Sequence, residues 1–357
     1  MITLAFVTNR RYLPGLRLAL ASMLLSGEEG DSFDLWVFHS DLSSRDSRAL
    51  QAIVKRFSAR ASLRFQTISE ADFSVFNPQI TGSFIAYTKL VLPDFIPSRF
   101  FAFVDSDMLV MRSFRPLFED VKGGSVLAGS MDRQLPTLAD DCPWELTEDE
   151  KKLPYLNTGF IVYDQQAWAK TKMKEKLRHL TVDGCPKLGL HDQTILNYAA
   201  RGQVQVIPLG WNRHFLPIFC QGHLNDLATE IAEEGRNFHF VANPKPWLTA
   251  EPTPNSLVWW AASEEIFGRF RSLLYRLEAC RADRKFARDY FLRLAARGLL
   301  GLGIDLTRGA PPQNQGSLWG RLRVIAQKFA EERANSAALD VIVRKVRQHF
   351  RARRTSH

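Results

Sequence analysis

Apolar and polar residues follow two different rhythms through the first 210 residues of the chain. Short apolar runs have the length and composition of β-strands, and the stretches between them repeat apolar residues at the spacing of amphipathic helices. The predicted strands are 2–7, 34–38, 62–67, 100–104, 125–130, 160–163 and 204–208. The predicted helices are 16–25, 44–57, 165–180 and 192–201. This alternation predicts an α/β domain with a mostly parallel sheet of about seven strands.

The pattern changes after a proline-rich stretch at 244–254. From there the sequence is helical and basic, and it is interrupted by a linker rich in Gly, Pro, Asn and Gln at 298–316. We therefore expect an α/β domain at 1–257, followed by a helical, basic C-terminal region at 258–357.

Charged residues are distributed unevenly between the two parts of the chain. The formal net charge is +9, yet residues 1–260 hold 27 basic and 29 acidic side chains, whereas residues 261–357 hold 20 and 9. A basic excess confined to one end favours an acidic partner for that end, such as a membrane surface or nucleic acid. An ordinary solvated surface is the alternative.

The C-terminal region contains two amphipathic stripes with basic residues beside them. The apolar members of the last stripe are Leu339, Ile342, Val343, Val346 and Phe350. Its basic neighbours are Arg344, Lys345, Arg347 and Arg351. The earlier stripe comprises Trp319, Leu322, Ile325 and Phe329. Such helices either lie in the interface of an anionic membrane or pack on the preceding domain, and the sequence leaves both open.

Composition limits the classes of protein to consider. Apolar residues make up 45% of the chain, enough for a large core, and no apolar run reaches the roughly 18–20 residues of a membrane-spanning helix. Met1 leads directly into a predicted strand. The four cysteines lie far apart without a Cys-x-x-Cys pair, which argues against a disulfide scaffold or a cysteine zinc site. We expect a cytoplasmic protein, with any membrane contact peripheral and on the inner face.

Two carboxylates follow directly on a predicted buried strand. Asp105 and Asp107 come after the apolar run Phe100–Val104, with Ser106 between them. The carboxyl ends of strands are where α/β folds bind their ligands. A turn at that point can bring both carboxylates onto one hard cation, Mn²⁺ or Mg²⁺, which in turn neutralises a diphosphate. Their place after a strand makes this pair the strongest local candidate for a site.

Three further segments each have an ordinary structural explanation beside a functional one. Asn157-Thr158-Gly159 is a small polar turn that leads into an apolar strand. Asp192 and Gln193 stand where a helix begins, so Asp192 can be an N-cap. His239 lies between two phenylalanines and can be a core histidine, and Lys245 can be a loop lysine. Taken singly, none of them decides between structure and function.

The order and spacing of these segments resemble glycosyltransferase family 8, the retaining GT-A enzymes that include glycogenin and bacterial lipopolysaccharide galactosyl- and glucosyltransferases. The resemblance covers about residues 2–247. Its matching motifs are Tyr87-Thr88-Lys89-Leu90, Asp105-Ser106-Asp107, Asn157-Thr158-Gly159, Asp192-Gln193, and the set of His239, Lys245, Pro246 and Trp247. The resemblance implies a GT-A nucleotide-diphospho-sugar transferase fold with a Rossmann-like sheet.

The resemblance also implies a role for each matching residue. The implied ligands of a Mn²⁺ or Mg²⁺ ion are Asp105, Asp107 and His239. Asp192 and Gln193 are implied to stand beside the anomeric carbon as catalytic residues. The implied contacts of the donor nucleotide and its sugar are Val7, Thr8, Asn9, Tyr12, Lys89, Asp105, Ser106, Asn157 and Lys245.

The implied activity is transfer of galactose or glucose from a UDP-sugar to a hydroxyl of a glycan or glycolipid, in bacterial lipopolysaccharide or other surface-glycan synthesis. Because the amide of Gln193 is a poor nucleophile, a same-face attack and a covalent intermediate both stay open. The rival interpretation is a catalytically silent protein that binds sugar nucleotides or nucleic acid. Without a zinc-finger or RNA-recognition signature, we expect no nucleic-acid partner.

Three positions depart from the family pattern. Lys89 stands where the family usually has arginine, so the charge is kept and the planar fork is lost. Asn9 stands where an aspartate often meets the uracil ring, and an amide both donates and accepts. Ala242 replaces a glycine, and if that position needs a positive φ the alanine costs about 1 kcal/mol.

Overall fold

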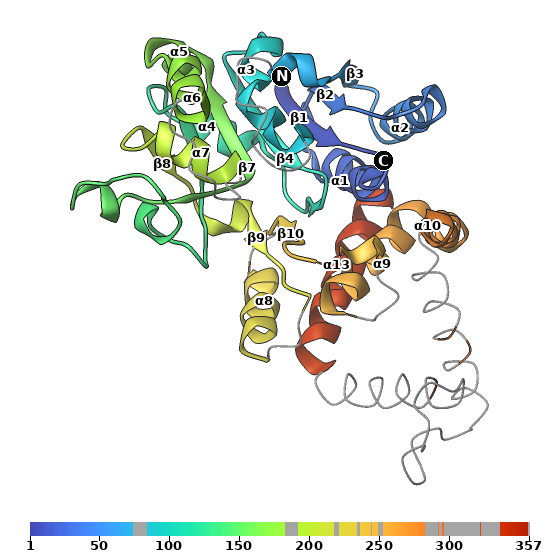
Figure 1. Ribbon diagram of the computed structural model, residues 1–357. Helices are drawn as coiled ribbons and strands as arrows, with labels where there is room; N and C mark the ends of the chain where they lie inside the picture. Colours follow the sequence, from blue (N-terminus) through green and yellow to red (C-terminus); the bar gives the residue numbers. More distant parts are fainter. Residues whose placement is uncertain are drawn as a thin grey trace. The chain divides into compact units, whose positions relative to one another are not determined.

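The computed structural model describes residues 1–73, 84–182, 192–217, 221–233, 236–243, 245–248, 253–282 and 336–355, and the single residues 292, 295 and 322 (Figure 1). The chain forms two compact units. The first comprises Met1–His214 and Arg236–His239, and the second comprises Phe215–Gly235 and Phe240–His357. The boundary predicted near residue 257 falls inside a helix of the second unit, because the chain leaves the first unit earlier and returns to it briefly.

A seven-stranded sheet organises the first unit, which is the blue to green part of Figure 1. The strands are β1 (Ile2–Thr8), β2 (Phe33–His39), β3 (Ala61–Thr67), β4 (Phe100–Asp105), β6 (Leu127–Met131), β7 (Leu156–Asp164) and β8 (Val204–Val206). Their order is β3-β2-β1-β4-β7-β6-β8. β7 is antiparallel to β4 and β6, and all other neighbours are parallel. The predicted α/β fold with a mostly parallel sheet is confirmed.

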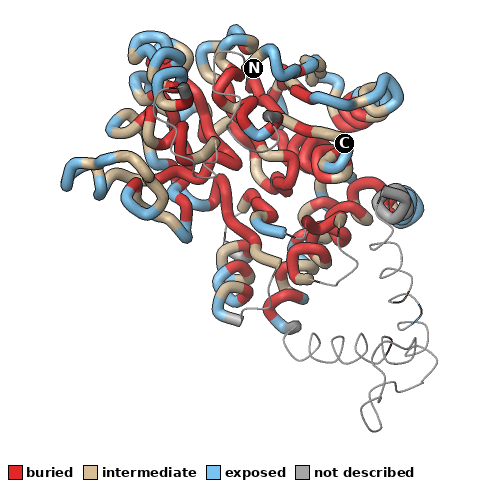
Figure 2. Tube along the Cα trace, in the orientation of Figure 1, coloured by how far each residue is buried: buried red, intermediate tan, exposed pale blue. Residues whose placement is uncertain are grey.

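Burial along the strands matches this order. The central strands β1, β4 and β7 are buried over nearly their whole length, because a central strand is covered on both faces (Figure 2). β3 has no fully buried residue and alternates exposed with half-buried positions, as expected of a strand at the edge of a sheet. Burial thus rises from the edge strand β3 to the central strands β1, β4 and β7.

The helices of the first unit follow the same logic. They are α1 (Leu13–Ser26), α2 (Ser44–Phe57), α3 (Leu92–Phe95), α4 (Arg115–Asp120), α5 (Gln165–Lys170), α6 (Met173–Val182) and α7 (Asp192–Ala199). α1 is apolar and almost entirely buried, whereas α2 is amphipathic and begins with a capping box between Ser43 and Asp46. The single helix predicted at 165–180 is divided into α5 and α6 near Lys172, whose φ of +55° is incompatible with a continuous helix.

A second, three-stranded sheet in the first unit joins segments that are far apart in the sequence. It contains β5 (Met108–Leu109), β10 (Phe238–His239) and β9 (Arg213–His214), in that order. β10 is antiparallel to β5 and parallel to β9, and its register places His239 opposite Met108 and His214. Residues Arg236–His239, which rejoin the first unit, therefore place His239 next to the turn that follows β4.

The second unit is helical. Its helices are α8 (Gln221–Glu233), the short 3₁₀ helix η6 (Pro246–Leu248), α9 (Pro254–Phe267), α10 (Arg269–Ala282) and α13 (Ser336–Thr355). Trp247 and Trp259 are fully buried and pack with ring centroids 5.7 Å apart. Within the described ranges, none of the helices is both long enough and apolar enough to cross a bilayer.

α13 corrects the hypothesis that its apolar stripe enters a membrane. The helix packs on α8 and α9, and the stripe residues Leu339, Ile342, Val346 and Phe350 are buried in the core of the second unit. Of the two alternatives left open by the sequence, packing is therefore the right one for this stripe. The earlier stripe falls outside the described residues, apart from Leu322, which is buried.

Candidate active site

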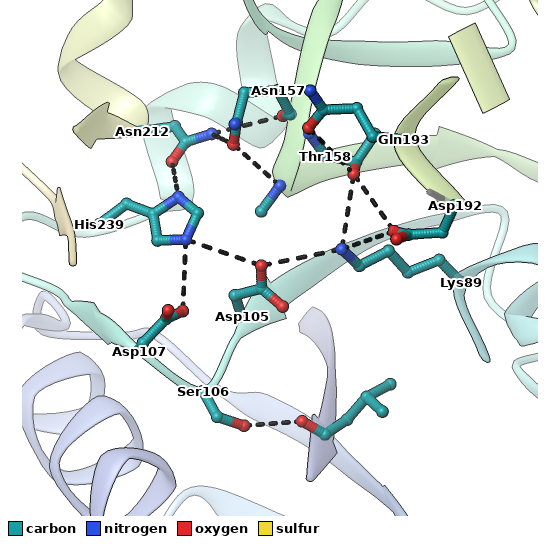
Figure 3. A network of polar contacts seen from close by, with 12 residues as sticks. Lys89, Asp105, Ser106, Asp107, Asn157, Thr158, Asp192, Gln193, Asn212 and His239 are labelled. Carbon is teal, nitrogen blue, oxygen red and sulfur yellow. Dashed lines mark hydrogen bonds and ion pairs between the residues drawn. The ribbon is translucent and has the colours of Figure 1, made fainter. Parts of the chain in front are cut away.

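β4 carries Asp105 to the carboxyl edge of the main sheet. The strand is buried up to Val104, and Asp105 is its last residue, with a side chain that is 30% exposed. Asp107 lies in the two-residue turn before β5 and is almost fully buried. Between them, Ser106 Oγ donates to the backbone carbonyl of Val7 at 2.7 Å. The hydroxyl of Ser106 therefore ties the turn to the end of β1 (Figure 3).

His239 completes a three-residue cluster with the two aspartates. Its Nε2 lies 3.3 Å from Asp107 Oδ1 and 3.7 Å from Asp105 Oδ2 (Figure 3). The possible ligand atoms of the three residues all lie within 4.8 Å of one another. His239 is buried, as expected of a core histidine, but its Nε2 faces the carboxylates of the two aspartates. The predicted metal ligands are thus brought together.

The chemistry of this donor set suits a hard divalent cation. Carboxylate oxygens are ordinary ligands of Mn²⁺ and Mg²⁺, and the imidazole nitrogen suits a transition-metal ion such as Mn²⁺ better than Mg²⁺. Burial raises the pKa of Asp105, although the nearby ammonium of Lys89 acts in the opposite direction. Burial is therefore the main cause of the raised pKa of Asp105, and the neighbouring carboxylate of Asp107 adds to it.

Lys89 lies between two carboxylates. It belongs to the 3₁₀ helix η2 (Phe84–Leu90), and its Nζ lies 2.9 Å from Asp192 Oδ2 and 3.7 Å from Asp105 Oδ2. The ammonium also stands 4.7 Å from the ring centroid of Phe103. Burial alone would lower the pKa of Lys89, but Asp105 and Asp192 outweigh it and raise the pKa to about 12. Lys89 is therefore charged at every physiological pH.

The start of α7 faces the start of β7. Asp192 is the first residue of α7, and its carboxylate contacts Lys89. Gln193 Oε1 accepts from the backbone N–H of Thr158 at 3.0 Å. Asn157-Thr158-Gly159 lies inside β7 and not in a turn before it, which corrects the sequence interpretation.

Asp132 is a polar residue of the site that the sequence interpretation missed. It is buried, and its Oδ2 accepts from Asn157 Nδ2 at 2.9 Å and from Gln193 Nε2 at 3.2 Å. Burial alone would raise the pKa of Asp132, but hydrogen bonds from Asn157 and the backbone of Gln134 outweigh it and lower the pKa. Its place just after β6 was a usable signal, the same one that marked Asp105.

The end of β1 adjoins this edge of the sheet. Val7 is in register with Asp105, and the following Thr8 is buried. Asn9 Oδ1 accepts from the backbone N–H groups of Arg11 at 3.0 Å and Tyr12 at 3.2 Å. The oxygen of Asn9 is thus occupied at the start of α1, and its amide N–H₂ is the group that can face a ligand.

Comparison with known proteins decides the family. The sequence profile described as "Glycosyl transferase family 8" matches residues 3–251. The chain belongs to glycosyltransferase family 8. Its sheet is the mixed, mostly parallel sheet of GT-A glycosyltransferases.

The relatives of this family 8 chain are distant. Glycosyltransferase GlyF of Streptococcus pneumoniae is 21% identical over 72% of this chain and 60% of its own length. General stress protein A of Bacillus subtilis is 22% identical over 66% of this chain and 83% of its own length. Galactosyltransferase LgtC, solved with donor and acceptor sugar analogues, matches with a TM-score of 0.53 at 20% identity over 69% of this chain and 89% of LgtC. The alignment thus spans less than two thirds of GlyF.

The last motif of the family lies partly in the second unit. Lys245 is buried there, and its Nζ donates to the backbone carbonyl of Phe240 at 3.1 Å. Its predicted contact with the donor phosphates stays a prediction. Ala242 has a φ of +66°, so the position does adopt the left-handed conformation that the family's glycine permits. The substitution of glycine by alanine therefore stores backbone strain at this loop.

Proposed function

We propose that this family 8 protein is a retaining, metal-dependent hexosyltransferase that moves galactose or glucose from a UDP-sugar to a hydroxyl of a glycan or glycolipid. The observation that carries the proposal is the convergence of Asp105, Asp107 and His239 at the carboxyl edge of the sheet. The fold it shares with LgtC, a galactosyltransferase solved with donor and acceptor sugar analogues, supports a sugar-nucleotide donor.

Asp105, Asp107 and His239 would hold a Mn²⁺ or Mg²⁺ ion. Cations of this kind are bound in proteins through one or two carboxylates together with substrate phosphates. When bound, the ion supplies positive charge that stabilises the departing diphosphate. The aspartates and the histidine would hold the ion beside the end of β4 and β10, and the diphosphate would then bind at the carboxyl edge of the sheet.

Lys89 and Asp192 supply fixed charges beside the donor. The ammonium of Lys89 can form a hydrogen bond with a donor oxygen and stabilise negative charge that develops on it. Asp192 is paired with Lys89 at 2.9 Å, and it orients sugar hydroxyls and stabilises positive charge at the anomeric carbon. The pair therefore supports opposite charges that separate as the bond to the diphosphate breaks.

We favour attack by the acceptor on the face that the diphosphate leaves. Both ends of the Gln193 amide are already hydrogen-bonded, Oε1 to Thr158 and Nε2 to Asp132. A neutral amide in this setting is a weak nucleophile. The acceptor oxygen then bonds to the anomeric carbon as the bond from that carbon to the phosphate oxygen breaks, and the hydroxyl proton passes to the leaving phosphate.

The acceptor is proposed to be a bacterial lipopolysaccharide or another surface glycan, made by a cytoplasmic enzyme at the inner face of the membrane. Because the stripe of α13 is buried, α10 is the better candidate for membrane contact. Its Phe270 is 75% exposed, and Leu273 and Leu274 are 42% and 41% exposed. Arg269 and Arg271 flank this apolar face. Apolar and basic residues together favour an anionic lipid surface.

The experiment is a screen of nucleotide sugars for release of the nucleoside diphosphate, with Mn²⁺, with Mg²⁺ and with EDTA. We expect slow, Mn²⁺-dependent hydrolysis of UDP-galactose or UDP-glucose by the purified protein, and faster release when an acceptor glycan is added. Asp149→Asn, a change in an exposed carboxylate, is the control that should hydrolyse the donor normally. Binding of the donor without any hydrolysis would mean that the protein is a sugar-nucleotide binder.

A further inference from the structure

His239 has a second nitrogen, and a chain of amides contacts it. His239 Nδ1 lies 2.9 Å from Asn212 Oδ1. Asn212 Nδ2 donates to Asn157 Oδ1 at 2.8 Å, and Asn157 Nδ2 donates to Asp132 Oδ2 at 2.9 Å (Figure 3). His239, Asn212, Asn157 and Asp132 are all buried. An uninterrupted row of hydrogen bonds therefore runs from a carboxylate to the imidazole.

The orientation of each amide follows from its neighbours. The backbone N–H of Gly159 donates to Asn157 Oδ1 at 3.0 Å, so that oxygen is an acceptor and the Asn157 N–H₂ group faces Asp132. Asn212 must then present its N–H₂ group to Asn157 Oδ1, which leaves Asn212 Oδ1 facing the ring. Because an amide oxygen only accepts, His239 Nδ1 carries the proton.

The other tautomer, with the proton on Nε2, could not bind a cation through that nitrogen. A proton on Nε2 would point at Asp107 Oδ1, 3.3 Å away, where a carboxylate would accept it. Nε2 would then have no lone pair for a cation, since a metal ligand must be the unprotonated nitrogen. The carboxylates therefore favour the unproductive tautomer, and Asn212 is the group that opposes them.

Gly159 provides the room in which the ring is held. A Cβ at this position would come within 2.5 Å of His239 Nδ1 and closer still to Cε1. The strand β7 thus contacts the ring on the side of Cε1 and Nδ1, while Asn212 accepts from Nδ1. The placement of His239 is fixed by backbone as well as by hydrogen bonds.

We propose that Asn212 is a positioning residue, which holds His239 as the Nδ1–H tautomer and directs Nε2 at Asp105 and Asp107. The row of hydrogen bonds through Asn157 ends on Asp132, whose carboxylate can only accept and so sets the direction of every bond in the row. The inference rests on the proposed function, because the cation of that function is what Nε2 would bind. Outer partners of this kind commonly change metal affinity 10–100-fold.

The test uses the full-length protein with ¹⁵N-labelled histidine and two variants of Asn212. Asn212→Leu removes the acceptor, and Asn212→Asp keeps an acceptor for Nδ1 while it loses the donor to Asn157. The tautomer is read from two-bond ¹H–¹⁵N spectra without metal, and the His239 signals are assigned by their loss in His239→Gln. Mn²⁺ affinity is measured by electron paramagnetic resonance, and thermal unfolding is recorded for each variant.

We expect the Nδ1–H pattern for His239 in the wild type and in Asn212→Asp. Asn212→Leu should lose that pattern and bind Mn²⁺ about 10–100-fold more weakly. A purely structural role predicts that both variants lose affinity in proportion to their loss of thermal stability, and that result would overturn the inference. So would an Nε2–H pattern in the wild type.

The outcomes separate this inference from the proposed function. A wild type that shows the Nδ1–H pattern but binds no Mn²⁺ would contradict the metal site and leave the tautomer assignment standing. If the wild type and a folded Asn212→Leu bind Mn²⁺ with equal affinity, the metal site is supported and the positioning role of Asn212 is contradicted. If Asn212→Leu does not fold, Asn212→Asp decides, because a folded Asn212→Asp that binds Mn²⁺ as weakly as His239→Ala would overturn the inference.

Discussion

The two units of the protein arrange their charged groups in different ways. In the first, three carboxylates, those of Asp105, Asp107 and Asp192, gather around the ammonium of Lys89 and the ring of His239. In the second, Arg347 contacts Glu264 at 3.0 Å and Glu265 at 3.2 Å, and Arg351 contacts Glu265 at 3.0 Å. The second network matches two carboxylates with two guanidinium groups, whereas the first has more negative than positive charge.

This difference distinguishes a network in which carboxylates and guanidinium groups are matched from one in which carboxylates predominate. Two guanidinium groups against two carboxylates leave no excess charge, so the network in the second unit explains itself as structure. Carboxylates held close together repel one another, and clusters of this kind are common at functional sites. The gathering of Asp105, Asp107 and His239 is therefore consistent with the proposed cation site.

The largest effect on donor hydrolysis is expected when one carboxylate of the first unit's cluster is neutralised. Asp107→Asn takes away one negative ligand and should reduce Mn²⁺-dependent donor hydrolysis on the order of 10³-fold, about 4 kcal/mol. Without metal, the variant should be as stable as the wild type or more so, because repulsion with Asp105 is relieved. Hydrolysis rates and thermal unfolding with and without Mn²⁺ measure both effects. Wild-type rates in Asp107→Asn and Asp105→Asn would contradict the metal assignment.

Substitutions of Lys89 test the contribution of the positive charge in the same cluster. Lys89→Arg keeps the charge and should keep most activity, whereas Lys89→Ala should cost about 2–4 kcal/mol of transition-state stabilisation. Values of kcat and KM for the preferred donor measure the loss. Unchanged kinetics in Lys89→Ala would remove the residue from the site and leave its ion pair with Asp192 as a structural contact.

The sequence was sufficient for the sheet and for the aspartate pair, and for clear reasons. Central strands are buried on both faces, so their apolar runs are long enough to recognise, and Asp105 and Asp107 follow one of them directly. Asn212 was missed because it is a single polar residue without a spacing pattern, whereas Asp132 follows β6 directly and its signal was overlooked. Asp132 belongs to the site through its hydrogen bond with Asn157 of β7, and Asn212 through its contact with His239 of the small sheet.

Amphipathicity was the least reliable guide. The stripe on α13 has the pattern of a membrane-binding helix and also of a helix that packs on its neighbours, and it does the latter. Periodicity shows that one face avoids water but not what covers that face. The same limit explains Asn157-Thr158-Gly159, since polar residues suggested a turn where the side chains are satisfied inside a strand.

The third prediction concerns a titratable group in α13 of the second unit. Burial, assisted by Arg353, lowers the pKa of His349 to about 4. The unfolded chain, with an ordinary histidine pKa, binds the proton first as the pH falls from 7, so stability is present at neutral pH and lost on acidification. At pH 5 the loss is about 2 kcal/mol. Urea unfolding at pH 7 and pH 5 should show it in the wild type and less of it in His349→Gln. An equal pH effect in both proteins would exclude His349 as its cause.

The smallest effect is expected in the balanced network. Arg347→Met keeps the aliphatic stem that packs on α9 but removes the charge facing Glu264 and Glu265, so the free energy of unfolding should fall by about 0.5–1 kcal/mol. The deficit should shrink in 0.5 M salt, because partly exposed ion pairs are screened. Arg344→Met, an exposed position on the same helix, is the matched control and should change stability by less than about 0.5 kcal/mol.

Donor hydrolysis should be unchanged in both variants, since neither alters the excess negative charge of the first unit. A loss of Mn²⁺-dependent hydrolysis in folded Arg347→Met would mean that the second network also serves the reaction, and the contrast between the two units would fail.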